Sequence, residues 1–309
     1  MSFSATDAAF EGFRLVRRNP VALVGWTLLY LVYTLATLFA AGGMMRSMAV
    51  WMEQVEALEA GPAPSSPEAL VPIMESYMAA MSHMVWAIPL SLVIGAVLMA
   101  AIARAVLTPA TGGFGYMRLG MDEVRVFVVT LVIAILYACA TAVAFAAAFI
   151  IGGIAIGAME GGGALVMVLA VLAAIAFMIW LGVRWSLAVP ITVDQKKFAF
   201  FDSFAVTKGR FWPLLGMAVI AFIMVIIVSL LAGIVTMPIS MMGGMSMFGN
   251  MGEDPTEMFR NFNPTNPWII ASSVVNAFVY ALTVAVLYAP FSAAYRDIVG
   301  TTRGAAASE

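Results

Sequence analysis

Apolar positions along the chain form long continuous runs, without the strict alternation of half-buried strands. The stretches that contain no Asp, Glu, Lys or Arg are 19–45, 76–103, 126–159, 161–183, 211–252 and 261–295. A hydrocarbon core about 30 Å thick requires about 20 apolar residues in a helix, so each stretch is long enough to cross a membrane once. A membrane β-barrel would show alternating apolar and polar positions, which these runs lack.

We therefore predict an all-α fold, a polytopic six-helix transmembrane bundle that forms a single integral membrane domain over residues 1–309. The predicted spans are 20–43, 82–106, 125–157, 164–189, 213–238 and 267–291, with outer loops at 46–81 and 240–266. Asn19-Pro20 and Asn266-Pro267 place an N-cap residue before a proline at the first helical position. Three glycines at 161–163 predict a tight turn between the third and fourth spans.

Composition agrees with the run pattern and excludes other classes of protein. The chain is 63% hydrophobic and 10% charged, whereas a soluble globular domain averages about 25% charged residues. Disorder is excluded as well, because disordered chains combine low hydrophobicity with high charge. A net charge of −2 gives no indication of nucleic-acid binding. A single cysteine, Cys139, excludes a disulfide framework and a cysteine-based zinc site within one chain.

Basic residues are divided unequally between the two sides of the predicted topology. Of the 15 lysines and arginines, only Arg46 and Arg260 fall on the side opposite the termini. The positive-inside rule therefore predicts a bacterial inner-membrane protein with its N- and C-termini in the cytoplasm. Together with Glu160, the predicted outer loops carry nine of the 17 acidic residues, so the predicted outer face is acidic.

Three units of similar organisation follow one another along the chain. Each has a predicted cytoplasmic amphipathic helix, at 6–18, 114–125 and 196–212, followed by a helical hairpin. In 114–125, apolar residues recur at helical spacing while charged residues share another face. Such segments are typical of interfacial helices that rest on an anionic leaflet, and a docking site for a cytoplasmic partner is the alternative.

Two stretches resemble a family of uncharacterised bacterial inner-membrane proteins. Arg104-Ala-Val-Leu-Thr-Pro with the segment 116–125, and Phe201-Asp-Ser-Phe-Ala-Val-Thr-Lys-Gly-Arg-Phe-Trp-Pro, are similar to YciC-type proteins. They are also similar to the membrane domain that accompanies some glycerophosphoryl diester phosphodiesterases. The resemblance implies a six-span fold and an inner-membrane location. It implies no activity, because this chain has no room for the soluble phosphodiesterase domain.

The sequence holds no recognisable catalytic or nucleotide-binding motif. Arg118, Asp122 and Arg125 are predicted to form a cytoplasmic ion-pair cluster, a candidate interaction site, rather than a catalytic one. Arg104 and Arg184 lie near cytoplasmic span ends, where long side chains can snorkel. Asn276 is a candidate intramembrane polar contact, such as an interhelical hydrogen bond.

Methionine is abundant, with 24 residues, 16 of which fall on or near the predicted outer side. The only histidine lies among them, in Met81-Ser82-His83-Met84. Thioether and imidazole are a soft ligand set that suits Cu(I), so Met81, His83 and Met84 are a speculative copper site. The favoured interpretation is that methionine serves as an adaptable apolar filler. No metal or cofactor is predicted.

The pattern favours a non-enzymatic structural or regulatory envelope protein. The first alternative is a transporter or permease subunit for a lipid-like or apolar substrate, and the second is outer-face Cu(I) binding through Met-rich loops. None of the predicted span centres contains a charged residue, which disfavours ion-coupled transport. Predicted partners are membrane lipids and either a membrane-protein partner or further copies of the chain. We predict no nucleic-acid partner.

Overall fold

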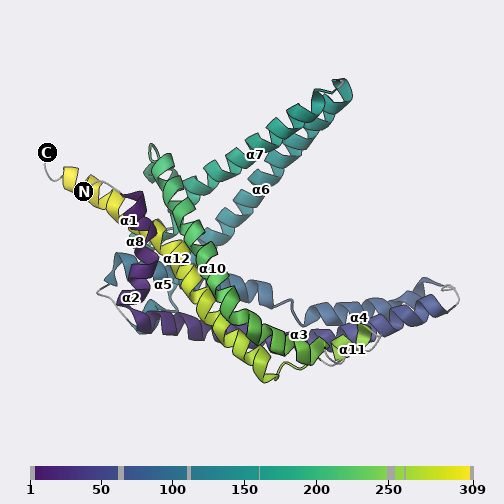
Figure 1. Cartoon of the computed structure of the whole chain (residues 1–309). Helices are drawn as coiled ribbons and strands as arrows, with labels where there is room; N and C mark the ends of the chain where they lie inside the picture. Colours follow the sequence, from purple (N-terminus) through teal and green to yellow (C-terminus); the bar gives the residue numbers. More distant parts are fainter. Residues whose placement is uncertain are drawn as a thin grey trace. The chain divides into compact units, whose positions relative to one another are not determined.

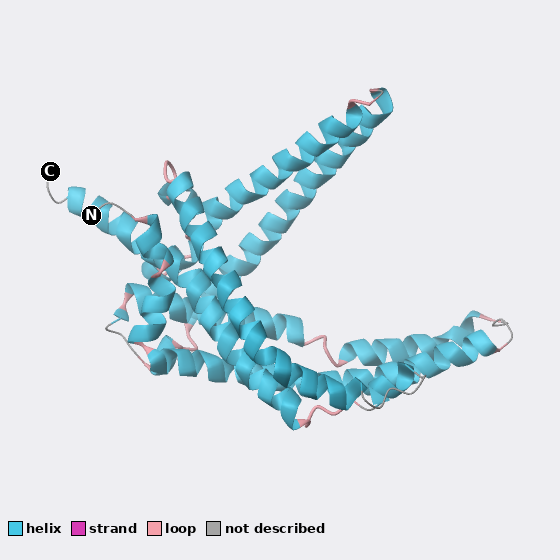
Figure 2. Cartoon of the chain, viewed as in Figure 1, coloured by secondary structure: helices cyan, strands magenta, loops and turns pink. Residues whose placement is uncertain are grey.

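The computed structural model describes residues 4–61, 66–109, 113–159, 161–248, 255–260 and 262–306. Within these ranges the regular structure is helical and no strand occurs (Figures 1 and 2). Six helical segments are long and apolar enough to cross a membrane: Pro20–Ala60, Val71–Leu107, Met121–Ala158, Gly163–Gln195, Phe211–Met242 and Pro267–Gly300. The predicted all-α, six-span architecture is therefore confirmed.

The helices follow one another in a simple order along the chain (Figure 1). Their bounds are α1 Ala5–Ala9, α2 Glu11–Arg18, α3 Pro20–Ala60, η1 Pro67–Leu70, α4 Val71–Ser82, α5 Ala87–Leu107, η3 Phe114–Tyr116, α6 Met121–Ala158, α7 Gly163–Trp185, α8 Ala188–Gln195, α9 Asp202–Val206, α10 Phe211–Phe248, α11 Pro255–Arg260 and α12 Pro267–Ala306. α3 and α12 begin at the two prolines that the sequence indicated.

The helix ends differ from the predicted spans, most of all in the predicted loop at 46–81. α3 continues to Ala60 and α4 covers Val71–Ser82, so much of that loop is helix. The reason is composition: residues 46–60 contain no glycine or proline and are rich in strong helix formers such as Met, Glu, Ala and Gln. α10 likewise extends to Phe248, into the predicted loop at 240–266.

None of the three predicted amphipathic helices is one continuous helix. In 114–125, the 3-10 turn η3 ends at Tyr116, and extended residues separate it from α6. Gly115 and Tyr116 have φ of 66° and 55°, in the left-handed region that interrupts a right-handed helix. In 196–212, Lys196 is left-handed at the end of α8 and only α9 is helical before α10. The first segment, 6–18, forms α1 and α2.

The chain divides into two compact units, each built from separated stretches of sequence. The first unit contains Met1–Pro20, Gly95–Val225 and Val284–Glu309, and the second contains Val21–Ile94 and Ile226–Thr283. The ends of α5, α6 and α8 meet in a core of the first unit, formed by Ala96, Ala100, Ala103, Val126 and Val193.

α6 and α7 form a closely packed hairpin in the first unit (Figure 1). A Cβ on Gly163 would lie 2.4 Å from the carbonyl oxygen of Ala155, and one on Gly152 would lie 2.7 Å from Met167 side-chain atoms. Glycine at these positions lets the two helices approach closely, as small residues do between membrane helices. Tyr137 ties them again by donating a hydrogen bond of 3.2 Å to the carbonyl of Met178.

α3 and α12 run antiparallel in the second unit. The rings of Tyr30 and Tyr280 stack with centroids 3.7 Å apart, and Gly42 lies against Pro264, just before α12 begins. Residues later in α3 therefore lie beside residues nearer the start of α12. Beyond Gly42, α3 packs on α4, where Ser76 donates to the side-chain oxygen of Gln54 at 2.7 Å and Trp51 contacts Tyr77.

Candidate functional site

Arg104, near the end of α5, and Glu123, in the first turn of α6, are, together with Glu11, the most buried charged residues among those that the structure describes. Each residue is only 6% exposed. The Arg104 guanidinium donates to the Glu123 carboxylate and to the backbone carbonyl of Tyr116. The other carboxylate oxygen of Glu123 accepts the backbone N–H of Gly120 at 3.0 Å, which caps the start of α6. The ion pair and its backbone bonds therefore join α5, the residues 116–120 and the start of α6.

This arrangement corrects the expectation that Arg104 snorkels toward water. Its guanidinium is turned into the protein, where a carboxylate and a carbonyl surround it. A single arginine within an apolar helix needs a counter-ion when it is buried. The signal that could have indicated Glu123 is its place three residues after Gly120, where a capping carboxylate points back toward the helix start.

The predicted cytoplasmic cluster lies at the protein surface, close in sequence to this buried pair, and consists of Arg118, Asp122 and Arg125. Asp122 and Arg125 form an i,i+3 ion pair of 2.7 Å with side chains 30% and 22% exposed. Arg118 is exposed in the extended segment before α6. Asp122 and Arg125 are thus brought together as the spacing indicated, and the role of the cluster remains a prediction.

Arg184 lies near the end of α7 and holds the segment that follows α8. It donates to the carbonyl of Phe204 and to the hydroxyl of Thr207, both at 3.3 Å, and its guanidinium lies 5.4 Å from the centre of a Trp180 ring. Ser203 and Thr207 are fully buried, and the Ser203 hydroxyl accepts the backbone N–H of Leu187 at 3.2 Å. α9 is thereby fixed against the end of α7.

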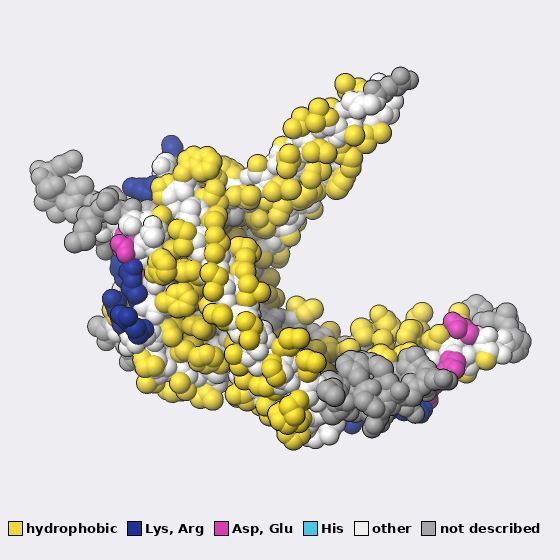
Figure 3. Space-filling model, in the orientation of Figure 1, with side chains coloured by type: hydrophobic (Ala, Val, Ile, Leu, Met, Phe, Trp, Pro, Cys, Tyr) yellow, Lys and Arg dark blue, Asp and Glu magenta, His cyan; other side chains and the backbone are white. Residues whose placement is uncertain are grey.

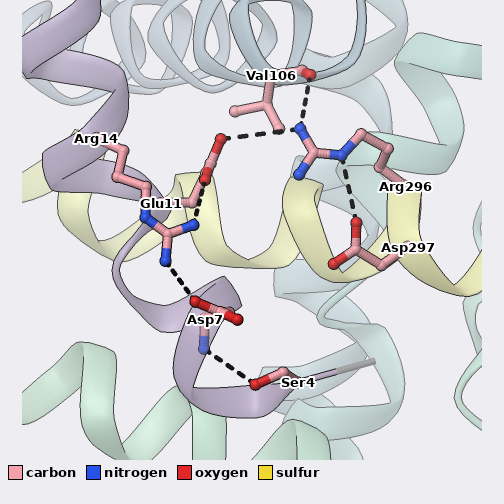
Figure 4. A network of polar contacts seen from close by, with 7 residues as sticks. All are labelled: Ser4, Asp7, Glu11, Arg14, Val106, Arg296 and Asp297. Carbon is pink, nitrogen blue, oxygen red and sulfur yellow. Dashed lines mark hydrogen bonds and ion pairs between the residues drawn. The ribbon is translucent and has the colours of Figure 1, made fainter. Parts of the chain in front are cut away.

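The last part of α12 makes two further polar contacts within the first unit. The Tyr295 hydroxyl donates to Asp194 at 2.7 Å. Arg296 lies 3.8 Å from Glu11 of α2 and contacts the carbonyl of Val106 (Figure 4). Figure 4 also shows Glu11 bound to Arg14, which in turn reaches Asp7 of α1. These bonds connect the N-terminal helices to the ends of α5 and α12.

Uncharged polar residues gather along α3 and α12 in the second unit. We call the set Thr27, Tyr30, Thr34, Tyr280, Thr283 and Asn276 the polar seam. Its helices meet at the Tyr30–Tyr280 stack, and Thr27 and Thr283 each lie one turn from that stack on the same side of it. Among the described residues, the hydroxyls of Thr27 and Thr283 are buried without a hydrogen-bond partner. Asn276 is exposed on the surface of α12, so an interhelical contact for its amide remains a prediction.

His83 follows α4 directly and lies against α3. Its ring occupies the space left by the missing side chain of Gly43, where a Cβ would lie 2.8 Å from Nδ1. Its Nε2 lies 3.4 Å from the hydroxyl of Ser47. Met81 and Met84 are half-buried beside it in the sequence. One imidazole nitrogen thus already faces a hydroxyl partner, and copper binding by Met81, His83 and Met84 remains a prediction.

Comparison with curated proteins gave no match, and comparison with solved structures gave none either. The resemblance to YciC-type proteins and to the phosphodiesterase membrane domain remains a prediction. A sequence profile does match residues 5–298, which is nearly the whole chain, and it describes DUF7847, a domain of unknown function. The chain, a multi-pass helical membrane protein, therefore belongs to the DUF7847 family.

Proposed function

We propose that this protein is a non-enzymatic structural or regulatory element of a bacterial inner membrane, with both termini in the cytoplasm. The observation that carries the proposal is how the first unit uses its buried charges. Arg104, Glu123, Glu11 and Arg184 each bind a backbone carbonyl, a hydroxyl or an opposite charge of a neighbouring segment. Such contacts fix connecting segments to helix ends and leave these groups committed to the fold.

The orientation has a direct test. With Cys139 replaced by alanine, a cysteine at Leu119, which is 93% exposed, should resist a membrane-impermeant thiol reagent in intact cells. A cysteine at Glu59, exposed near the end of α3, should react. The basic-residue distribution is the reason for this expectation. Labelling at Leu119 with protection at Glu59 would reverse the proposed topology.

The structural role is tested by complementing a deletion strain with variants of normal abundance. For a structural element, the phenotype should follow the amount of folded protein, so Asp122→Asn, Asn276→Leu and Tyr280→Phe should each complement. Capture of the tagged protein, with analysis of the bound lipids and proteins, then identifies what it supports. Loss of complementation at normal abundance in one of these variants would contradict a purely structural role.

The polar seam supports a second candidate, transport of a lipid-like substrate. The buried hydroxyls of Thr27 and Thr283 have no hydrogen-bond partner, which is costly inside hydrocarbon and favours binding of a polar molecule such as water or a lipid headgroup between the two helices. Proteoliposomes that carry a fluorescent lipid in both leaflets and are treated with external dithionite would measure lipid exchange. This candidate is favoured if the wild-type protein speeds lipid exchange and the double variant Thr27→Val, Thr283→Val abolishes that increase. Thr141→Val is the matched control, since the Thr141 hydroxyl bonds its own helix in α6.

A further inference from the structure

The short helix α2 has one face packed against the protein and one face free. Gly12 lies so close to α12 that a Cβ there would be 2.5 Å from the Cα of Val286, and Leu15 is buried beside it. On the opposite face, Phe10 and Phe13 are 44% and 37% exposed. Two aromatic rings facing outward at helical spacing are unusual on a surface in contact with water, and they mark a place for an apolar occupant.

A hollow lies on this free face. It has a volume of about 350 Å³ and is lined by Phe10, Phe13, Arg14 and Arg17. Its lining therefore combines two aromatic rings with two guanidinium groups. A ligand that fits it has an apolar part and an anionic part.

The charges around the hollow leave a net attraction for an anion. Arg14 is occupied, because it binds Asp7 at 2.8 Å and Glu11 at 3.3 Å, and Glu11 also faces Arg296. Arg17 and Arg18 are exposed in the last turn of α2. Within the part of the chain that the structure describes, neither is paired with a carboxylate. Figure 3 shows Lys and Arg side chains gathered in this region of the first unit.

The place of α2 in the sequence indicates the level of the hollow relative to the membrane. α2 ends at Arg18, and α3, the first membrane-crossing helix, begins two residues later at Pro20. Arg17 and Arg18 therefore lie at the level where a membrane changes from hydrocarbon to headgroups. Phosphate groups of lipids occupy that layer, and basic residues beside a span are attracted to anionic lipids there.

We propose that the hollow on α2 binds one anionic phospholipid, with its phosphate at Arg17 and its acyl chain along Phe10 and Phe13. The guanidinium of Arg17 can form two parallel hydrogen bonds to a phosphate, which a lysine cannot reproduce. Arg18 adds charge to the same headgroup layer. The inference requires only that the chain crosses a membrane, and it holds whether the protein supports the envelope or transports lipid.

The experiment is native mass spectrometry of the full-length protein in detergent, titrated with phosphatidylglycerol or with phosphatidylcholine of the same acyl chains. The wild type should retain one phosphatidylglycerol in preference to phosphatidylcholine. Arg17→Gln should weaken that binding about fivefold, because one basic residue near an anionic lipid surface contributes about that factor. Phe10→Ser with Phe13→Ser should weaken both lipids. Lys208→Gln, which removes an exposed charge from another loop, should leave binding unchanged.

Further measurements distinguish a lipid site from a free-phosphate site and from loss of folding. Inorganic phosphate at millimolar concentration should not displace the lipid, and displacement would show a free-phosphate site instead. Circular dichroism checks that each variant is folded, and Arg17→Lys, which keeps the charge, should retain part of the affinity. Equal binding of phosphatidylglycerol by wild type and Arg17→Gln would overturn the proposal, as would equal binding of the two lipids by the wild type.

Discussion

Arg104 and Arg184 stand at corresponding places, each near the end of an even-numbered span, yet the chain accommodates their charges differently. Arg104 is 6% exposed and binds the Glu123 carboxylate together with a carbonyl. Arg184 is half-buried and binds a carbonyl, the Thr207 hydroxyl and the face of Trp180. Neutral dipoles and an aromatic ring stabilise the charge of Arg184, whereas a carboxylate stabilises the charge of Arg104.

The difference teaches how burial sets the kind of partner that a charge requires. A fully buried guanidinium loses its hydration, and only an opposite charge with additional hydrogen bonds offsets that loss. A half-buried guanidinium keeps part of its hydration, so carbonyls and an indole face are sufficient. We therefore expect the two sites to respond very differently when one partner is removed.

The largest effect is expected for Glu123→Gln. Breaking a buried pair leaves the Arg104 charge uncompensated, which costs about 3–5 kcal/mol. The folded yield and the thermal midpoint in detergent should both fall sharply. A midpoint within one or two degrees of the wild type would show that water reaches Arg104 in the folded protein.

A paired variant sharpens that result. Arg104→Met combined with Glu123→Leu removes both charges and keeps apolar volume, and such replacements of buried ion pairs are often neutral or stabilising. The double variant should therefore unfold at a higher temperature than Glu123→Gln alone. Failure of this rescue would mean that the bonds to Gly120 and Tyr116 matter more than the charges.

A smaller loss is expected for Arg184→Met. The substitution removes two hydrogen bonds and a cation–π contact but strands no opposite charge, so the cost should be about 1–2 kcal/mol. The comparison is made by measuring the thermal unfolding midpoints of Arg184→Met and Glu123→Gln side by side. A loss as large as that of Glu123→Gln would contradict the distinction between the two arginines.

Thr207→Val tests the neutral side of the comparison. Thr207 is fully buried, and its hydroxyl accepts from Arg184 and donates to the carbonyl of Ser203 at 2.8 Å. Valine keeps the shape but removes both bonds, at a cost of about 1 kcal/mol. Protease cleavage within 196–212 should increase with the loosened anchor, whereas Thr141→Val should leave that cleavage unchanged.

The smallest effect is expected for Asp122→Asn. Asp122 and Arg125 form a partly exposed pair beside the buried one, and exposed pairs contribute about 0–1 kcal/mol. Unfolding temperature and yield should remain close to those of the wild type. A severe loss would assign this carboxylate to the stabilisation of Arg104 or to a functional contact.

Local sequence was enough to predict some structural details. Pro20 and Pro267 begin their helices as expected, because proline suits the first helical turn. Gly161 and Gly162 lie in the turn that precedes α7, and Gly163 begins that helix. The i,i+3 spacing also predicted the contact between Asp122 and Arg125. Each of these features depends on residues within a few positions of one another.

Features that depend on distant residues escaped prediction. Glu123 and Arg104 are separated by 19 positions, and nothing in either neighbourhood says that the two side chains meet. The apolar spacing in 114–125 indicated a helix, yet Gly115 and Tyr116 turn left-handed so that the Tyr116 carbonyl reaches Arg104. A tertiary bond to a buried charge outweighs a helical pattern, because local propensities are worth only fractions of a kcal/mol per residue.

The sequence by itself determined that the chain is an all-α membrane protein with six spans, because the transfer of long apolar runs into hydrocarbon outweighs every other term. Only the tertiary structure decided how the span ends are tied together, which arginine receives a carboxylate and where aromatic rings remain exposed beside Arg17. Those choices depend on which side chains lose water when distant segments pack, and burial of that kind is a property of the assembled fold.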